Sequence, residues 1–358
     1  MKTQNYYFIG TMSGTSMDGL DLVYVKFTKV YSWDFKILAA RTYNYNSNWL
    51  DKLNNSIYLS LKALHQLDKE YSTFIADLIL TFIKEFKIDN LDGVGSHGHT
   101  IFHQPDQGFT YQIGNLPLVA NKIKKPFICD FRVQDVMLEG QGAPLVPVGD
   151  KFLFHNYDAC LNLGGFSNIT IKKGTKLTAY DICALNTVLN PLANQLNLAY
   201  DNGGKEAKKG KLIDTFFHEL EQISFYDLKP PKSLGIEWVR DNLQIILKKY
   251  LDKPVQDLLN TYTIHSANQI AKNLDNISSV LVTGGGAFNS FLISSIKDKT
   301  NCKIIIPGTD IVNFKEAIIF AFLSVLKLRG EVNCLASVTG SKYDHSSGKI
   351  FLPNTSID

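Results

Sequence analysis

Two glycine-rich turns, each following a short apolar segment, constrain this chain more than any other feature of its sequence. The first follows Tyr6–Ile9 and reads GTMSGTSMDGLD over residues 10–21, after which Leu20–Phe27 alternates apolar and polar side chains. The second lies in ACLNLGGFSNITIKK, residues 159–173, and repeats that order. Alternation with a period of two predicts strands, and glycine permits the reversal between them. The sequence therefore predicts two similar β-hairpins about 150 residues apart.

A repeated hairpin predicts a duplicated α/β fold, and the chain length agrees with this. At 358 residues the chain exceeds the usual limit of one hydrophobic core, so we expect two domains, over residues 1–150 and 151–358. A strongly apolar helix is predicted over Lys315–Leu328. Whether this last helix packs back on the first domain is left open.

The segments between the turns predict further strands and helices. Strands are expected at Phe35–Tyr43 and Leu91–Gly95, two helices between Asn48 and Phe86, and helices at Lys211–Ile223 and Ile236–Leu251.

Composition excludes several classes of partner and cofactor. A net charge of +3 is too small to indicate nucleic acid or a membrane surface, and no apolar run is long enough to span a bilayer. The start of the chain lacks a signal-peptide pattern. The five cysteines are odd in number, widely spaced and without a CxxC pair, which favours a reducing compartment over disulfides or zinc. We therefore expect a cytoplasmic protein.

A third glycine-rich turn, TGGGAFN, stands between a buried strand at Val280–Val282 and a helix. Backbone N–H groups in such turns converge on anions, and in the first turn the hydroxyls of Thr15 and Ser16 add donors. One turn alone is better explained by simple chain reversal, but three such turns in this order are much harder to explain in that way. Neither the P-loop pattern nor the dinucleotide fingerprint is present, because no Gly-Lys-Ser/Thr follows the glycines and the third fingerprint glycine is missing.

Seven motifs in order over residues 10–289 carry a family resemblance: MSGTSMDG, GSHGHT, YQIGN, DFRVQDV, GQGAPLVP, LNLGGFSN and TGGGAFN. With them the chain resembles the anhydro-N-acetylmuramic acid kinases of the actin, Hsp70 and sugar-kinase superfamily. The resemblance implies two actin-like (ribonuclease H-like) domains with an ATP cleft between them, and ATP and Mg²⁺ as cofactors.

The resemblance also implies the nucleotide contacts. They are Gly14, Thr15, Ser16, Met17, Asp18, Gly19, Leu20 and Asp21 in the first turn, Gly164, Gly165 and Ser167 in the second, and Gly284, Gly285, Gly286 and Asn289 in the third. The wider superfamily has an aspartate where this chain has Met12, so Asp18 and Asp21 become the candidates for holding Mg²⁺.

In the family's reaction, water opens the 1,6-anhydro bridge of the sugar and the released O6 takes the γ-phosphoryl group of ATP. A carboxylate must deprotonate that water. The family's base lies in Asp-x-Gly-Pro-Gly-Asn, which here reads DICALN, so the resemblance places the base at Asp181 but leaves the loop shape in question. Asp181 as a helix N-cap is the structural alternative.

The sugar contacts implied by the resemblance are His97, Arg132, Asp135, Asn186 and Glu316. Arg132 suits the lactyl carboxylate as a forked donor. The alternatives are a structural ion pair for Arg132 and Asp135, and a solvent-facing helix position for Glu316.

A histidine motif and one unusual residue remain to be interpreted. His97, His99 and His103 form HGHxxxH, but no supporting cysteine pair or HExxH helix favours a metal there. Glu139 stands where the family usually has a glycine.

Three functions remain open at this point. The first is a kinase for 1,6-anhydro-N-acetylmuramate in cell-wall recycling, expected as a homodimer. The second is a related kinase for another sugar or amino sugar. The third is a non-catalytic sugar sensor. Such sensors often carry a DNA-binding helix pair, and the first strand, expected from Tyr6, leaves no room for one, which argues against this function.

Overall fold

The computed structural model describes residues 3–14, 17–174 and 176–354, and the chain divides into two compact units. Unit 1 comprises 1–153 together with 314–358, and unit 2 comprises 154–313. The first boundary lies three residues from the one expected after residue 150, whereas the segment from Phe314 onward groups with unit 1.

Unit 1 is built on a mixed sheet. Its strands are β1 (Gln4–Ser13), β2 (Gly19–Lys29), β3 (Trp33–Asn44), β4 (Gly93–Gln104), β5 (Phe109–Ile113), β6 (Phe127–Cys129) and β12 (Lys349–Phe351). They follow the order β12-β6-β4-β1-β2-β3, and β5 pairs with β4 outside this path. β1, β2 and β3 are antiparallel neighbours, while β1, β4 and β6 are parallel.

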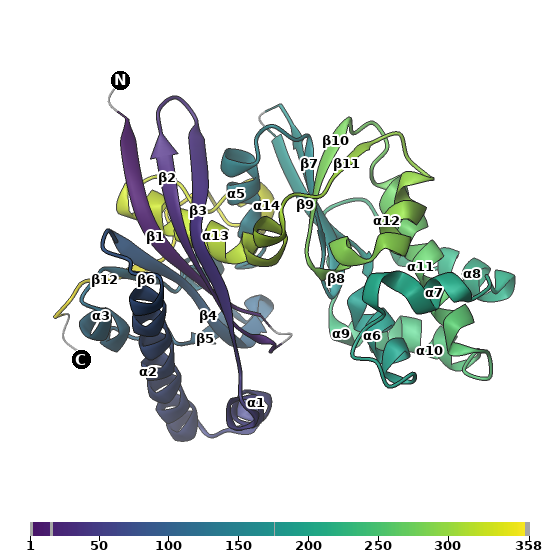
Figure 1. Ribbon diagram of the computed structural model, residues 1–358, viewed down its shortest axis with the longest axis horizontal. Helices are drawn as coiled ribbons and strands as arrows, with labels where there is room; N and C mark the ends of the chain where they lie inside the picture. The colour runs from purple at the N-terminus through teal and green to yellow at the C-terminus, as the bar shows by residue number, and fades with distance from the viewer. Residues whose placement is uncertain (1–2, 15–16, 175, 355–358) are drawn as a thin grey trace. The chain divides into compact units, whose positions relative to one another are not determined.

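Helices cover both faces of this sheet. They are α1 (Ser47–Asn54), α2 (Leu61–Glu85), α3 (Leu118–Ile123), α4 (Val133–Met137), α5 (Val146–Leu153), α13 (Thr309–Leu328) and α14 (Ala336–Thr339). Figure 1 shows α2 and α13 on different sides of the strands. Because successive side chains of a strand point to opposite faces, Ile9 packs in the core with α2 while the adjacent Gly10 faces α13.

The contact between α13 and the sheet depends on glycine at two positions. A Cβ on Gly10 would lie 1.9 Å from the Ala317 carbonyl oxygen, and one on Gly95 would lie 2.6 Å from the Phe320 carbonyl oxygen. Both contacts are with backbone, which cannot move aside as a side chain can. The helix therefore lies directly on β1 and β4, and this explains why the segment from Phe314 belongs to unit 1.

Unit 2 repeats the plan. Its strands β7 (Ala159–Leu163), β8 (Phe166–Lys173), β9 (Lys176–Ala184), β10 (Ser279–Thr283) and β11 (Lys303–Ile305) follow the order β11-β10-β7-β8-β9. Its helices are α6 (Asn186–Asn194), α7 (Lys205–Lys209), α8 (Asp214–Glu221), α9 (Ile236–Trp238), α10 (Gln244–Lys248), α11 (Val255–Lys272) and α12 (Ser290–Lys297).

The two sheets share one topology. In each, three antiparallel strands come first along the chain, a fourth then adds in parallel beside the first, and a further strand adds in parallel beside the fourth. The sheet of unit 1 has β5 and β12 in addition. The two hairpins predicted a duplicated fold and the family resemblance implied its ribonuclease H-like form, so the predicted α/β fold class is confirmed.

Most predicted elements are present with shifted ends. α13 begins six residues before the predicted helix start, and the helix expected at Ile236–Leu251 is split into α9, a π-helical segment at Val239–Leu243 and α10. The polar run SHGHT continues β4 instead of ending it, because β5 pairs with that part of the strand. No helix within the described residues is long and apolar enough to cross a membrane.

Candidate active site

The first glycine-rich turn joins β1 to β2 in unit 1. Met17 takes a left-handed backbone conformation, with φ of 56°, and its N–H donates to the Gly14 carbonyl at 3.2 Å. Gly19 is required because a Cβ there would lie 2.5 Å from the Tyr43 carbonyl oxygen. Asp18 is exposed, whereas the Leu20 side chain is fully buried and leaves only its backbone for a ligand. The predicted contacts Thr15 and Ser16 lie outside the described residues.

Asp21, just after the turn, belongs to a group of carboxylates that includes Asp18 and Glu316. Asp21 stands opposite Met12 in the β1–β2 register, so the two side chains share one face of the sheet. Asp21 therefore presents a carboxylate on the face where the superfamily's aspartate would stand. Burial raises the pKa of Asp21 to about 6, against a hydrogen bond from Thr42 at 2.5 Å, and the charges of Glu316 and Asp18 raise it further.

Arg132 interacts electrostatically with one member of this group, Glu316. The charge of Glu316 is the largest influence opposing the burial that lowers the pKa of Arg132. Burial raises the pKa of Glu316, and Arg132 is the first charge that counteracts it. Glu316 is thus a partly buried residue whose pKa responds to the charges of its own unit, and the solvent-facing alternative is wrong.

His97 fixes the position of Arg132. Its Nε2 accepts a hydrogen bond from Arg132 Nε at 2.9 Å, and its Nδ1 lies 2.9 Å from the Gly98 carbonyl, to which it must donate. Burial, then the charge of Arg132, lowers the pKa of His97 well below its usual value. Both ring nitrogens of this neutral histidine are therefore used within the protein, and its direct role is to orient Arg132.

Asp135 does not occupy the sugar-contacting position expected from the sequence. It is fully buried, and its Oδ2 accepts from the Gly142 N–H while its Oδ1 accepts from Thr339 Oγ1, both at 2.7 Å. These bonds tie α4 to the turn at 140–142 and to the C-terminal segment. No ion pair joins Asp135 to Arg132 among the described residues, so the structural ion pair given as the alternative is not found either.

A buried ion pair beside Glu316 escaped prediction. Lys315 Nζ lies 2.7 Å from Asp150 Oδ1, and both side chains are almost completely buried. The charges of Lys315 and Asp150 both act on the pKa of Glu316. The only sequence signal was a lysine adjacent to the predicted site residue in an apolar helix.

In unit 2 the second glycine-rich turn is held by Asn186. Its Nδ2 donates to the Gly164 carbonyl at 2.9 Å, and Thr187 Oγ1 donates to the Gly165 carbonyl at 2.9 Å. The first turn of α6 therefore fixes the β7–β8 turn. The predicted phosphate contact Ser167 is fully buried and lies 3.2 Å from Cys183 Sγ, so its hydroxyl points into the hairpin and away from solvent.

Asp181 lies in β9, four residues before the Leu185 cap of α6, so the N-cap alternative is wrong. The Leu234 N–H donates to Asp181 Oδ2 at 2.8 Å, and the Asp181 N–H donates to the Lys232 carbonyl at 3.0 Å. Burial raises the pKa of Asp181, against the lowering effect of the Leu234 bond. A fixed, partly buried carboxylate of raised pKa has the properties of a general base.

The altered residues around Asp181 are accommodated in the core. Cys183, Ala184 and Leu185 are all completely buried, and none has a positive φ. The loop that is rich in glycine in the family is here a strand end that leads directly into α6. Glu139 is different, since its φ of 65° is the left-handed conformation that favours the family's glycine.

The third glycine-rich turn follows β10. Gly284 has a φ of 82°, and a Cβ there would lie 2.6 Å from Asn162 Oδ1, so both conformation and space require glycine. Gly286 is packed against Leu163, whereas Gly285 is exposed. Asn289 caps α12 by accepting from the Leu292 N–H at 3.0 Å. Among these predicted nucleotide contacts, Gly285 offers the most accessible backbone.

The three histidines of HGHxxxH have separate partners. His99 Nδ1 lies 2.8 Å from Ser13 Oγ, and burial lowers its pKa to about 4, while His103 Nδ1 lies 3.0 Å from Thr110 Oγ1. His97 is occupied by Arg132 and Gly98. The described part of the chain contains no metal-ligand cluster that includes them.

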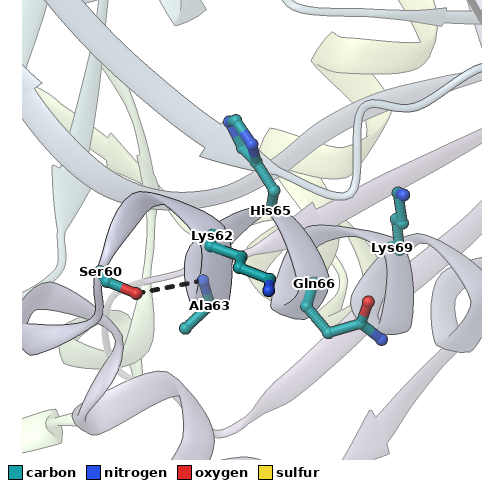
Figure 2. Close-up of a pocket in the computed structure, with 6 residues that line it drawn as sticks. All are labelled: Ser60, Lys62, Ala63, His65, Gln66 and Lys69. Carbon is teal, nitrogen blue, oxygen red and sulfur yellow. Dashed lines mark hydrogen bonds between the residues drawn. The ribbon is translucent and has the colours of Figure 1, made fainter.

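A depression elsewhere on unit 1 shares no residue with these sites. It lies over the start of α2, and Figure 2 shows its lining residues, Ser60, Lys62, Ala63, His65, Gln66 and Lys69. Most of these side chains are exposed, and Ser60 caps the helix by accepting from the Ala63 N–H at 3.4 Å.

Comparisons with known proteins find relatives over nearly the whole chain. A family model described as anhydro-N-acetylmuramic acid kinase matches residues 6–353. Proteins named anhydro-N-acetylmuramic acid kinase from Francisella tularensis subsp. novicida and Hydrogenovibrio crunogenus are 32% and 30% identical, covering 94% and 97% of this chain and 96% and 98% of theirs. One of the same name from Bacillus cereus is 30% identical over 97% of this chain and 99% of its own.

Proposed function

Because the chain belongs to the family of anhydro-N-acetylmuramic acid kinases, we propose that it phosphorylates 1,6-anhydro-N-acetylmuramate with ATP while opening the anhydro bridge with water. The observation that carries this proposal is Asp181, a carboxylate fixed by the Leu234 N–H and raised in pKa by burial. The product would be N-acetylmuramate 6-phosphate, which serves the recycling of cell-wall peptidoglycan.

In the proposed reaction Asp181 takes a proton from water as the oxygen bonds to the anomeric carbon. The bond from that carbon to the bridging oxygen breaks, and the released O6 attacks the γ-phosphorus of ATP, whose bond to the β-phosphate oxygen breaks to release ADP. Arg132, held by His97, would pair with the lactyl carboxylate as a forked donor, and Glu316 would face the sugar. Phosphoryl transfer of this kind depends on positioning and charge stabilisation.

The exposed parts of the three glycine-rich turns would bind the nucleotide. In the first turn, backbone N–H groups near Gly14 and the residues that follow it would contact phosphates. Gly164 and Gly165, fixed by Asn186 and Thr187, would act similarly, and Gly285 would lie against the adenosine.

Asp21 would hold Mg²⁺, and the negative charges of Glu316 and Asp18 act on its carboxylate. Carboxylate oxygens are the ligands that this ion prefers, and like charges that raise the pKa of Asp21 fit a site designed for a cation. When bound with ATP, Mg²⁺ would neutralise phosphate charge. We also propose that the enzyme acts in the cytoplasm as a homodimer, which sedimentation at several protein concentrations would test.

Mass spectrometry in ¹⁸O-labelled water tests the coupled reaction. Incubation with ATP, Mg²⁺ and anhydro-N-acetylmuramate is expected to give a phosphorylated product that carries the label at C1. A phosphorylated product without the label would refute coupled hydrolysis. Absence of product together with turnover of another sugar would instead favour the alternative of a related sugar kinase.

A substitution tests the base. Asp181→Asn is expected to lower kcat at least 1,000-fold, on the order of a general base's full contribution, and to leave ATP affinity nearly unchanged. Asp214→Asn, at an exposed carboxylate of α8 in the same unit, is the matched control. Retained turnover in Asp181→Asn would show that another residue activates the water.

A further inference from the structure

Three buried side chains of metal-ligand type converge in unit 1 next to Arg132, and none of them contacts ATP or sugar in the proposed reaction. One ligand atom from each of Asp135, Cys334 and His345 lies within 4.8 Å of the other two. Asp135 Oδ1 is 3.0 Å from Cys334 Sγ and 3.6 Å from His345 Nε2. Around a tetrahedral Zn²⁺ with bonds of about 2.0–2.3 Å, ligand atoms stand roughly 3.3–3.8 Å apart. Small movements would bring the three atoms to those separations.

The histidine gives the strongest indication. His345 Nδ1 lies 3.1 Å from the Tyr343 carbonyl, which can only accept, so Nδ1 carries the proton. In the neutral ring Nε2 then presents a lone pair, and it is buried without a hydrogen-bond partner while facing the Asp135 carboxylate. A histidine whose outer N–H donates to a backbone carbonyl is the usual arrangement of a zinc ligand. A cation between His345 Nε2 and Asp135 Oδ1 would accept a lone pair from each atom and so form two metal–ligand bonds.

The backbone holds the ligands in place. The Cys334 N–H donates to the His345 carbonyl at 3.0 Å, and the His345 N–H donates to the Cys334 carbonyl at 3.1 Å. The two side chains are therefore adjacent across an antiparallel bridge, and α4 supplies Asp135. Thr339 Oγ1, 2.7 Å from Asp135 Oδ1, is the nearest further oxygen.

Charge balance also favours a divalent cation. A carboxylate, a thiolate and a neutral imidazole carry a summed charge of −2, which Zn²⁺ cancels, so the buried cluster would be neutral. Thiolate with imidazole selects Zn²⁺ over the harder Mg²⁺. The geometry points to a structural zinc site formed by Asp135, Cys334 and His345.

Such a site would support the sugar-binding side of unit 1. Asp135 uses its other oxygen, Oδ2, to hold the Gly142 N–H, and the Gly142 carbonyl accepts from Arg132 Nη1 at 2.7 Å. A metal on Oδ1 would fix the carboxylate and, through this turn, the guanidinium. This consequence for Arg132 rests on the proposed function, whereas the metal site itself does not.

Metal analysis of the full-length protein tests the site. After dialysis against a chelator and then micromolar Zn²⁺, we expect one zinc per chain and a rise in the midpoint of thermal unfolding. Co²⁺ in place of Zn²⁺ should give thiolate-to-metal charge-transfer absorption. Failure of the wild-type protein to retain zinc, or Co²⁺ spectra without the thiolate band, would overturn the proposal, whatever the activity toward the sugar.

Variants separate a metal site from a hydrogen-bond network. Cys334→Ser keeps a hydroxyl that can donate to Asp135, and His345→Gln keeps a polar group, yet each is expected to weaken zinc binding at least 10-fold. Cys129→Ser, at a buried cysteine of the same unit with no such neighbours, should retain the zinc. Equal zinc binding by all three variants would overturn the assignment, and circular dichroism would verify that each is folded.

Discussion

His97 illustrates how a residue in a recognisable motif can act through its neighbour. Its two nitrogens are satisfied by Gly98 and Arg132, and burial lowers its pKa well below the usual value. It therefore neither ligates a metal nor transfers a proton. What it supplies is a fixed acceptor that limits the guanidinium of Arg132 to one orientation.

Removal of that acceptor should weaken sugar binding. We expect His97→Ala to raise KM for the sugar about 10-fold, which corresponds to the loss of one charge-assisted hydrogen bond, with a smaller change in kcat. His97→Gln should recover part of the loss, since its amide oxygen can accept from Arg132. Steady-state kinetics over pH 6–8 would measure this. A kinetic pKa that disappears in His97→Gln would contradict the view that His97 stays neutral.

The pKa of Asp21, about 6, makes the effect of Mg²⁺ dependent on pH. Because the folded-state pKa lies above the ordinary value, the metal-free protein binds this proton more tightly than the unfolded chain and loses stability as pH rises through 6. Mg²⁺ needs the ionised form, so its stabilising effect should be large at pH 7.5 and mostly lost at pH 5. Thermal unfolding with millimolar Mg²⁺ would measure it.

The matched variants for this test are Asp21→Asn and Asp51→Asn, the latter an exposed carboxylate in α1. The first should remove the pH-dependent part of the Mg²⁺ effect, and the second should leave it unchanged. An undiminished Mg²⁺ effect in Asp21→Asn would place the ion elsewhere.

At the level of elements, α13 shows how a helix can approach a sheet more closely than side chains permit. Gly10 on β1 and Gly95 on β4 present bare backbone to it. The same helix carries Glu316, whose charge interacts with those of Asp21 and Arg132. The close packing therefore serves the site as well as the core.

Gly10→Ala should disrupt that packing. The added methyl group would overlap the Ala317 carbonyl at 1.9 Å, so we expect the free energy of unfolding to fall by about 3 kcal/mol or more. Denaturant titration would measure it. Gly308→Ala is the control, because a Cβ there meets nothing within 4 Å. Similar stability of the two variants would show that α13 can shift away from β1.

The elements that could be predicted from the sequence are those with local signals. The β1–β2 and β7–β8 hairpins combine alternation with glycine at the turn, and both were found. β12 could not be foreseen, because its three residues form a strand only by pairing with β6, more than 200 residues earlier. The π-helical segment at Val239–Leu243 also has no local pattern that distinguishes it from a regular helix.

The candidate site likewise has features with local sequence signals and features without them. The family motifs predicted roles for Asp21, Arg132, Asp181 and Glu316, which remain predictions, and the glycine expected at position 139 corresponds to a left-handed conformation there. The sequence could not reveal that the Leu234 N–H donates to Asp181, or that Thr339 and Gly142 donate to Asp135. These contacts join distant segments, so no spacing along the chain records them.

At the level of the whole molecule, each unit has its own hydrophobic core. One core includes Leu64 and its neighbours on α2, and the other includes Leu292 and its neighbours on α12. Separate cores allow separate unfolding, so a single two-state transition is not expected for this chain.

Calorimetry tests that independence. Leu64→Ala and Leu292→Ala should each cost about 2–5 kcal/mol, and each should lower only the transition of its own unit. The wild-type calorimetric enthalpy should also exceed the van 't Hoff enthalpy. Coincident shifts of one transition in both variants would instead show that the two units unfold together.

The discontinuity of unit 1 has a consequence for how the chain is made. Residues 1–153 leave the ribosome first, but α13 and β12, which complete their sheet, follow only after all of unit 2 has been translated. At roughly 5–20 residues per second, the exposed face of β1 and β4 must wait on the order of 10 to 30 seconds for its helix. Unit 2, which is continuous, can finish folding within that interval. A segment made after unit 2 thus covers a sheet made before it, and a ribosome stalled before Phe314 would leave an apolar sheet face uncovered for chaperones to bind.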